Sequence, residues 1–237
     1  MKTRELFLDD QYMKECDSKV TMVEFTDMTV DQSVFFPTRA GEPNDKGTVT
    51  INGKDYVIVD VWEDGENIHL ISLDTYPQDI AGQTVHQKID WDVRYNHMRY
   101  RSALFLISGI AYKFYNARCR MNQTYEDNAW IDVYVDEMNE EKLEKIKTEM
   151  KKIIESGIDI NASYISRDEF TKNSQLMNLS KDKMPEGDNI RIINISGLPM
   201  QPDNGVHVKN TREIGDFEIT TTMAKGKMER RLTVKLK

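Results

Sequence analysis

Residues 47–59, Gly-Thr-Val-Thr-Ile-Asn-Gly-Lys-Asp-Tyr-Val-Ile-Val, carry the clearest structural signal in the chain. Two runs rich in β-branched residues flank Asn52-Gly53, a dipeptide that strongly favours the two-residue turn of a β-hairpin. Further strands are expected over residues 19–25, which alternate with a period of two, and over residues 67–73. Short strands at this spacing predict a small β-barrel in residues 1–90.

The rest of the chain, residues 91–237, mixes helix and strand signals. Apolar residues at three- and four-residue steps predict a helix over residues 91–117. A second helix is expected over residues 139–156, with Asn139 as its N-cap and Gly157 just past its end. Strands are expected at 129–135, 191–195, 217–220 and 232–236, and the polar stretch 167–188 is expected to be a loop or small insertion. The fold class is therefore α+β, with a barrel domain in 1–90 and a second domain in 91–237.

Charge and composition narrow the function classes. The 237 residues carry a net charge of −8. Residues 1–90 hold 8 basic and 18 acidic side chains, whereas residues 91–237 hold 24 and 22, which suggests two units with different partners. A chain with a net negative charge is not a general DNA- or RNA-binding protein, because binding to phosphates needs a basic surface. The two distant cysteines, Cys16 and Cys119, argue against a disulfide scaffold and favour a reducing compartment. With no apolar run of membrane-spanning length and no secretory leader, we expect a cytoplasmic protein without a membrane partner.

Four segments are dense in residues that bind or catalyse. The first, 35–47, packs aromatic, proline and glycine residues into a stiff loop. The second, 98–106, lies in the first expected helix and places Arg101 and Phe105 one turn apart on the same face. In the third, 201–215, Asp203 and His207 can converge across a turn. The fourth, 225–231, is strongly basic.

Together these segments resemble the free-standing alanyl-tRNA editing proteins, which are relatives of the editing domain of alanyl-tRNA synthetase. The resemblance covers nearly the whole chain, and its residues occur in the family's order: Phe35-Phe36-Pro37, then Met98-Arg99 with Ala103-Leu104, then Asp203, His207-Val208 and Asn210-Thr211-Arg212-Glu213-Ile214-Gly215, then Lys225-Gly226-Lys227 and Arg230-Arg231. It implies an N-terminal barrel and a C-terminal α/β editing domain whose helices pack on an antiparallel sheet.

The resemblance also implies a chemistry and a partner. Family members hydrolyse alanine-tRNA mischarged with serine or glycine, which protects translation fidelity, and they bind the tRNA acceptor end. Their zinc is held by a His-xxx-His helix and a Cys/Asp-xxx-His turn. In this chain the helix positions are Arg101 and Phe105. Neither side chain can donate an electron pair to a metal, so Asp203 and His207 are the only retained ligand positions and no zinc is expected.

The altered residues leave several interpretations open. Arg101 either pairs with Asp203 in place of the metal or grips the carboxylate or phosphate of a ligand. Phe105 is expected to pack in the core, and His207 to be a neutral, hydrogen-bonded structural residue. Glu42, which stands where the family usually has glutamine, is either a general base or a solvated loop carboxylate. Ala40 in the same loop stands where a glycine is usual.

The basic segment has two interpretations as well. Lys225, Lys227, Arg230 and Arg231 are candidates to contact the tRNA backbone. Alternatively, their charges protect an edge strand from pairing with other chains.

Three functions follow from these interpretations. In the first, the protein hydrolyses mischarged alanine-tRNA in trans through a zinc-free pocket of Arg101, Asp203, His207 and Glu42. His207 would orient the water and Arg101 would stabilise the oxyanion. In the second, it is a catalytically inactive tRNA-binding paralogue. In the third, it binds a small ligand, whose carboxylate Arg101 would hold.

Overall fold

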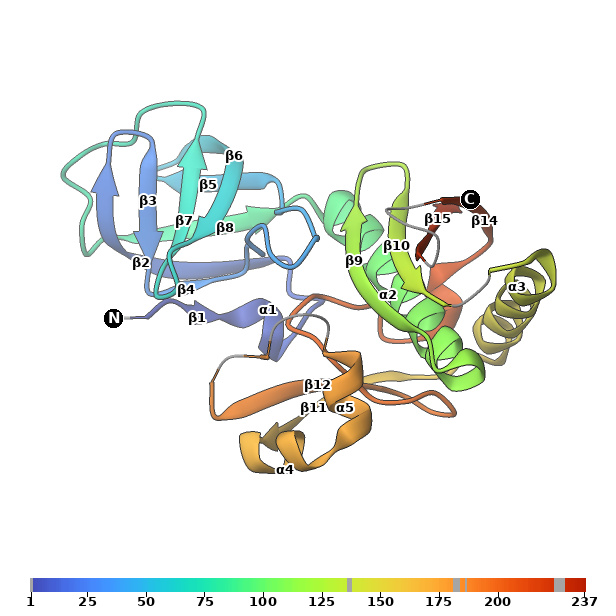
Figure 1. Cartoon of the computed structure of the whole chain (residues 1–237). Coiled ribbons are helices and arrows are strands. Elements are labelled where there is room, and N and C mark those ends of the chain that lie inside the picture. Colours follow the sequence, from blue (N-terminus) through green and yellow to red (C-terminus); the bar gives the residue numbers. More distant parts are fainter. Residues whose placement is uncertain (1, 136–137, 181–183, 186, 224–228) are drawn as a thin grey trace. The chain divides into compact units, whose positions relative to one another are not determined.

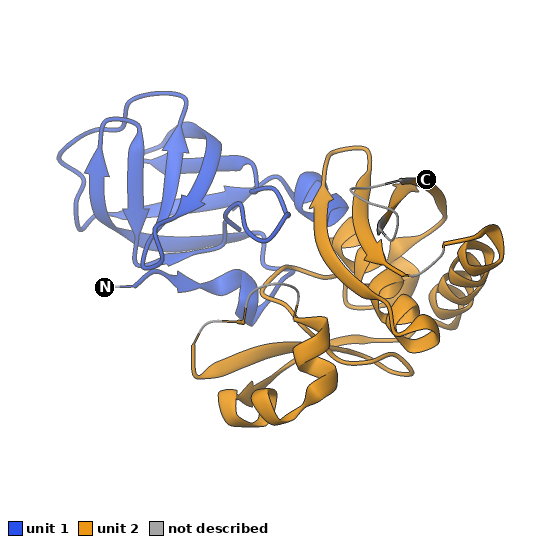
Figure 2. Cartoon of the chain, in the orientation of Figure 1, with its two compact units in different colours: residues 1–97 blue, residues 98–237 orange. Residues whose placement is uncertain are grey.

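The computed structural model describes residues 2–135, 138–180, 184–185, 187–223 and 229–237. The chain divides into two compact units, residues 1–97 and 98–237 (Figure 2). This division falls inside α2 (Trp91–Tyr115), so the domain boundary at residue 90 stays a prediction. The fold class is α+β, as the sequence predicted.

Unit 1 is a closed antiparallel β-barrel (Figure 1). Its strands follow one another around the barrel in the order β2 (Glu15–Glu24), β3 (Asp27–Val30), β7 (Ile68–Ser72), β6 (Lys54–Glu63), β5 (Gly47–Ile51) and β8 (Thr84–Ile89). Beside the barrel, β1 (Arg4–Glu5) pairs in parallel with β4 (Gln32–Ser33), and α1 covers Leu6–Asp9. The predicted small barrel is confirmed.

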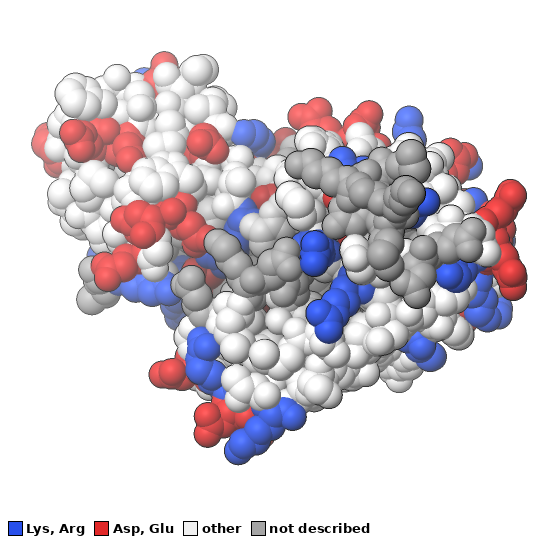
Figure 3. All heavy atoms as spheres, viewed as in Figure 1, with Lys and Arg blue, Asp and Glu red and all other residues white. Residues whose placement is uncertain are grey.

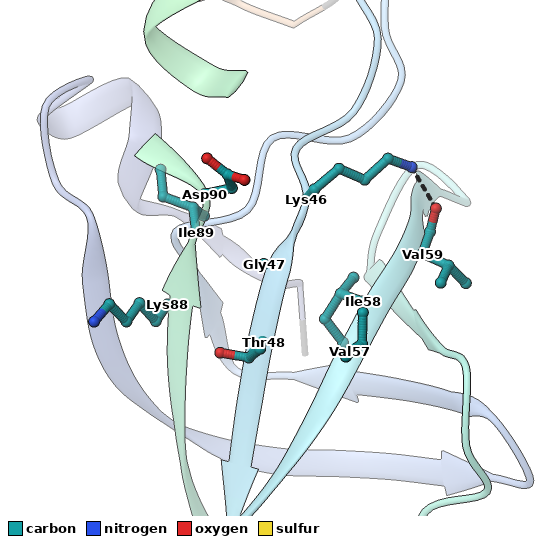
Figure 4. A pocket seen from close by; sticks show the side chains of 9 residues that line it. All are labelled: Lys46, Gly47, Thr48, Val57, Ile58, Val59, Lys88, Ile89 and Asp90. Atoms are coloured by element: carbon teal, nitrogen blue, oxygen red, sulfur yellow. Dashed lines mark hydrogen bonds between the residues drawn. The ribbon is translucent and has the colours of Figure 1, made fainter. Parts of the chain in front are cut away.

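The β5–β6 hairpin forms as its sequence predicts. Asn52 and Gly53 both have positive φ angles, 50° and 81°, which is the backbone of a type I′ turn. At the other end of β5, a Cβ atom on Gly47 would lie 2.2 Å from the carbonyl oxygen of Lys88, so only glycine fits between β5 and β8. A hollow of about 560 Å³ opens beside this glycine, where the Lys46 ammonium donates to the carbonyl of Val59 (Figure 4).

Unit 2 contains two antiparallel sheets. The first has the strand order β14 (Phe217–Met223), β15 (Glu229–Leu236), β10 (Ala129–Tyr134) and β9 (Arg118–Thr124). The second has the order β11 (Ile160–Ser166), β12 (Asn189–Ile195) and β13 (Gln201–Pro202). The helices of this unit are the part of α2 from Met98 onward, α3 (Glu140–Ser156), α4 (Arg167–Lys172), α5 (Ser174–Leu179) and the short 3₁₀ turn η1 (Thr211–Ile214). Figure 1 shows α2 lying against one face of the β9–β10 pair.

The two main helices begin and end close to their predicted positions. The side chain of Asn139 accepts a hydrogen bond from the backbone N–H of Lys142, which caps α3. Gly157 ends α3 in the left-handed conformation, with φ 67° and ψ 57°. Both caps were predicted and are confirmed. The first helix, α2, ends at Tyr115, two residues before the predicted end.

Of the two alternatives for the stretch 167–188, the loop was wrong and the small insertion is confirmed. It contains α4 and α5, and α4 begins with a capping box in which Ser166 and Glu169 bond each other's backbone N–H groups. Phe170 and Leu176 pack with Ile190 and Ile192 of β12 in a small core of their own. The two apolar anchors are too few to produce a helical period in the sequence.

Charges differ between the two units. In the view of Figure 3, acidic side chains predominate on unit 1, whereas unit 2 carries both signs. This agrees with the uneven distribution along the sequence. Among the described residues, no helix is both long enough and apolar enough to cross a membrane.

Candidate functional site

The candidate site in unit 2 is formed by α2 and by the segment between β13 and η1. Arg101 and Phe105 lie one turn apart on α2, and Asp203 and His207 belong to that segment. The structure brings these four predicted residues together. Arg101 and His207 are fully buried, and Phe105 and Asp203 are nearly so, with 5% and 9% of their surface exposed.

Arg101 and Asp203 form a two-pronged ion pair. The Nε of Arg101 donates to Oδ2 of Asp203 at 2.9 Å, and its Nη2 donates to Oδ1 of the same carboxylate. The remaining Nη1 donates to Oδ1 of Asn122 on β9 at 3.1 Å. This is the parallel fork that arginine and carboxylate groups prefer. Of the two interpretations of Arg101, the structure shows the internal charge pair.

His207 is hydrogen-bonded through both ring nitrogens. Its Nε2 lies 2.9 Å from Oδ2 of Asp203, and its Nδ1 lies 3.2 Å from Oγ of Ser102. The backbone N–H of Val208 donates to the same Ser102 oxygen at 3.2 Å. These partners assign the proton to Nε2, so that the imidazole donates to the carboxylate and accepts from the serine hydroxyl.

Burial and the neighbouring charges set the protonation states of His207 and Asp203. We call these two residues and Arg101, with the side chains that bond them, the cluster. Burial strongly lowers the pKa of His207, to about 4, although the hydrogen bond and charge of Asp203 act in the opposite direction. Burial alone would raise the pKa of Asp203, but the Arg101 guanidinium and the hydrogen bond from His207 hold it well below its usual range. At neutral pH the cluster therefore contains an ionised Asp203 and a neutral His207.

Phe105 packs against His207 and Arg101. Its ring meets the His207 ring edge to face, with 4.6 Å between centroids. The Arg101 guanidinium carbon lies 5.2 Å from the centre of the same phenyl ring. The phenyl group thus fills the space between the helix and the imidazole, as expected for a core residue.

Three residues of the cluster were not predicted from the sequence. They are Asn122 and Ser102, which bond Arg101 and His207, and Arg191 of β12. The Nη1 of Arg191 donates to the carbonyl oxygens of Asp203 and Gly205, both at 2.9 Å, and so holds the turn that carries Asp203. The sequence signal was an arginine between two isoleucines, Ile190 and Ile192. Partners so far apart in sequence have no fixed spacing.

The donor set does not fit the zinc that the family resemblance implies. Both oxygens of Asp203 accept hydrogen bonds from Arg101, and both nitrogens of His207 are engaged. A catalytic zinc needs three protein ligands, whereas the helix supplies a guanidinium and a phenyl ring here. Within the ranges that the structure describes, no group of three or more His, Cys, Asp or Glu side chains is placed to hold a metal ion.

The segment that matches the family motif best has a structural role. Residues 211–214 form η1, and a capping box between Asn210 and Glu213 stabilises its first turn. The hydroxyl of Thr211 donates to the carbonyl of Ile153 at 2.9 Å and accepts from the N–H of Ile158, so this segment closes the end of α3. The Nη2 of Arg99 donates to the carbonyl of Ile214 at 2.8 Å, which ties α2 to the same turn.

Glu42 lies in unit 1 and is fully buried. The interpretation of Glu42 as a solvated loop carboxylate was therefore wrong. Its loop is folded tightly: Arg39 and Glu42 exchange backbone hydrogen bonds, and Ala40 between them has a φ of 52°. Further along the loop, the guanidinium of Arg94 donates to the carboxylate of Asp45 and forms a second buried ion pair. The proposed role of Glu42 as a general base stays a prediction.

The basic segment is only partly within the described residues. Lys225 and Lys227 lie outside them. Arg230 and Arg231 belong to β15, which lies between β14 and β10 and is not an edge strand, so the edge-protection interpretation was wrong. The register places Arg230 opposite the buried Val133, whereas Arg231 lies opposite Asp132 on the other face and forms an ion pair with it.

The neutral state of His207 predicts a loss of stability in mild acid. The unfolded chain takes up a proton near pH 6.5, but the folded chain does so only near pH 4. The stabilisation is complete above pH 6.5 and is lost as the pH falls towards 4. Because one pKa unit corresponds to about 1.4 kcal/mol, His207 contributes about 3 kcal/mol at most to the free energy of unfolding. Urea unfolding at pH 7 and pH 4.5 measures the loss.

The same prediction can be checked on the imidazole itself. The NMR signal of the His207 ring is expected to stay constant from pH 8 to pH 5. A His207→Gln variant, which has no titrating ring, is expected to lose less stability over the same range. An ordinary titration of His207 near pH 6.5 would contradict the assigned neutral state.

Comparison with known proteins places the chain in a family. Residues 190–233 match the family described as the threonyl and alanyl tRNA synthetase second additional domain. The chain is 30% identical to the alanyl-tRNA editing protein AlaX-M of Saccharolobus solfataricus and 31% identical to that of Methanosarcina barkeri, over 97% of each chain. It is also 27% identical to the alanine–tRNA ligase of Thermococcus kodakarensis, over 93% of this chain and 24% of that protein. The chain therefore belongs to the alanyl-tRNA editing protein AlaX family.

Proposed function

We propose that this protein binds alanine tRNA, as the names of its relatives imply for them, but does not hydrolyse the aminoacyl ester through a zinc ion. The observation that carries the proposal is the Arg101 guanidinium, which lies buried against Asp203 where the family resemblance implies a metal. The guanidinium already neutralises the carboxylate. A divalent cation would have to displace it at a large electrostatic cost.

The same geometry favours binding over metal-free hydrolysis. A general base needs a free acceptor, but the Nδ1 of His207 accepts from Ser102 and the Nε2 proton is given to Asp203. An oxyanion needs donors aimed at it, whereas the donors of Arg101 point to Asp203 and Asn122. We therefore favour the tRNA-binding paralogue over the hydrolase with a remodelled pocket.

The small-ligand alternative has less support from the site. A ligand carboxylate held by Arg101 would have to replace Asp203, which would leave that ionised side chain buried without its partner. Losing one partner of a buried pair typically costs about 3–5 kcal/mol, more than one new ion pair returns.

The test uses alanine tRNA charged with radiolabelled serine. Release of serine is expected to match the uncatalysed rate, with added zinc and with chelator alike. The same tRNA is expected to bind in a filter assay, with an affinity that falls as salt rises. The AlaX-M protein of Saccharolobus solfataricus serves as the comparison under identical conditions. Turnover that zinc stimulates would contradict the loss of zinc chemistry, and undetectable tRNA binding at low salt would overturn the binding function.

A further inference from the structure

The β14–β15–β10–β9 sheet has a face that carries aromatic and arginine side chains. Alternate residues of β10 point to opposite faces, and Ala129, Ile131 and Val133 are buried on the face towards α2. Trp130, Asp132 and Tyr134 occupy the other face, which we call the outer face. The register adds these positions on the neighbouring strands: Glu229, Arg231 and Thr233 on β15, and Arg118 and Gln123 on β9.

Two guanidinium groups lie over aromatic rings on the outer face. The Arg231 carbon is 3.4 Å from the centre of the Trp130 ring, and its Nε and Nη2 donate to the two oxygens of Asp132, both at 2.8 Å. The Arg120 carbon is 5.3 Å from the centre of the Tyr134 ring, which is 38% exposed. Asp132 therefore holds the Arg231 guanidinium over Trp130, and this flat cation and the Tyr134 ring are surfaces on which a further ring can stack.

A polar hollow of about 270 Å³ opens at the β9 edge of the same face. Arg118, Arg120 and Tyr134 line it from the sheet, and Asn116 and Asn178 line it from outside the sheet. The Nη2 of Arg118 donates to Oδ1 of Asn178 at 2.8 Å, which orients the guanidinium within the hollow. Two guanidinium groups with amides beside them match the negative charge and the acceptor oxygens of a phosphate.

We infer that the outer face binds unpaired single-stranded RNA, with bases stacked at the Trp130–Arg231 pair and at Tyr134, and with a backbone phosphate in the hollow beside Arg118. This rests on the proposed tRNA binding and confines the contact of this sheet to unpaired nucleotides of the tRNA. Base stacking on aromatic side chains requires exposed base faces, which a duplex hides inside its stack.

The spacing of the two rings supports an extended strand. Trp130 and Tyr134 are four residues apart on β10, or about 13 Å at 3.2–3.4 Å per residue. A continuous base stack advances only about 3.4 Å per nucleotide. Neighbouring stacked bases therefore cannot reach both rings, whereas a strand with its bases splayed apart can.

The test compares paired variants by fluorescence anisotropy with a short single-stranded RNA and with alanine tRNA as probes. Tyr134→Ala is expected to weaken binding of the single strand about five-fold to a hundred-fold, the usual range for one lost base stack. Arg118→Gln is expected to weaken binding and to lower the salt slope by about one. The controls are Tyr164→Ala, an exposed tyrosine on β11, and Arg4→Gln, an exposed arginine in unit 1; both are expected to bind as the wild type does.

A spectroscopic readout separates stacking from a change in fold. Stacked bases are expected to quench the fluorescence of Trp130, and Trp130→Phe is expected to remove most of this quenching while binding remains, since phenylalanine can still stack.

The outcomes distinguish this inference from the proposed function. Suppose that the wild-type protein binds tRNA and that Tyr134→Ala and Tyr164→Ala have the same affinity for single-stranded RNA. This result would overturn the RNA-binding face and leave the proposed tRNA binding standing. Equal affinity for single-stranded RNA and for its duplex would also overturn the face. Wild-type protein that binds no tRNA would instead overturn the proposed function.

Discussion

Arg101→Ala is expected to lower the free energy of unfolding by about 3–5 kcal/mol, the usual cost of breaking a buried ion pair from one side. The substitution leaves the ionised carboxylate of Asp203 with 5% of its side-chain surface exposed and without its counter-charge. It also removes the donor to Asn122. Since whole domains are stable by only about 5–15 kcal/mol, this single change brings unit 2 close to unfolding.

A matched control separates burial from charge. Arg4→Ala breaks an ion pair with Asp9 whose side chains are 68% and 54% exposed. An exposed pair contributes about 0–1 kcal/mol, so this variant is expected to unfold almost as the wild type does. Urea unfolding followed by circular dichroism gives both values. A loss below 1 kcal/mol for Arg101→Ala would show that the pair does not hold the site together.

A double variant tests whether the charge itself is the cost. Arg101→Met with Asp203→Asn removes both charges and keeps an oxygen to accept the Nε2 proton of His207. Replacing a buried ion pair by uncharged groups of similar size is often neutral, so this variant is expected to recover most of the stability that Arg101→Ala loses. The wild type, Arg101→Met, Asp203→Asn and the double variant form a cycle, which gives the coupling free energy between the two positions.

Local signals in the sequence were sufficient for much of the fold. The Asn52-Gly53 turn and the caps Asn139 and Gly157 each depend on a few neighbouring residues, and all three form as predicted. The short helices α4 and α5 escaped prediction because few apolar residues anchor them. The central position of β15 escaped because strand order depends on pairing between distant segments.

The candidate site was predictable in its chemistry and less so in its surroundings. The types of residue at positions 101 and 203, a guanidinium and a carboxylate, predict a charge pair once the family resemblance brings them together. The partners Asn122 and Arg191 lie on strands β9 and β12, and no sequence motif links these strands to positions 101 and 203. The burial of Glu42 likewise follows from how its loop folds, which no local pattern in the sequence describes.

Arg101→His combined with Phe105→His is expected to create a zinc site in this protein. The Arg101 side chain reaches Asp203, and the Phe105 ring lies 4.6 Å from the His207 ring, so both positions on α2 face the two retained ligand positions. Imidazoles at 101 and 105 would complete a set of three nitrogens and one carboxylate oxygen, which suits tetrahedral zinc. Removing the guanidinium also frees the charge of Asp203 for a cation.

The expected effect is large and has a direct readout. The double variant is expected to hold one zinc per chain, and saturating zinc is expected to stabilise it by about 4 kcal/mol at a free concentration a thousand times the dissociation constant. Metal analysis and thermal unfolding with zinc or chelator measure both. Each single histidine variant offers only three ligands and is expected to bind more weakly. A double variant that binds no more zinc than the wild type would contradict this prediction. It would show that contacts which the substitutions leave in place, such as the bond between Ser102 and His207, keep the site closed to metal.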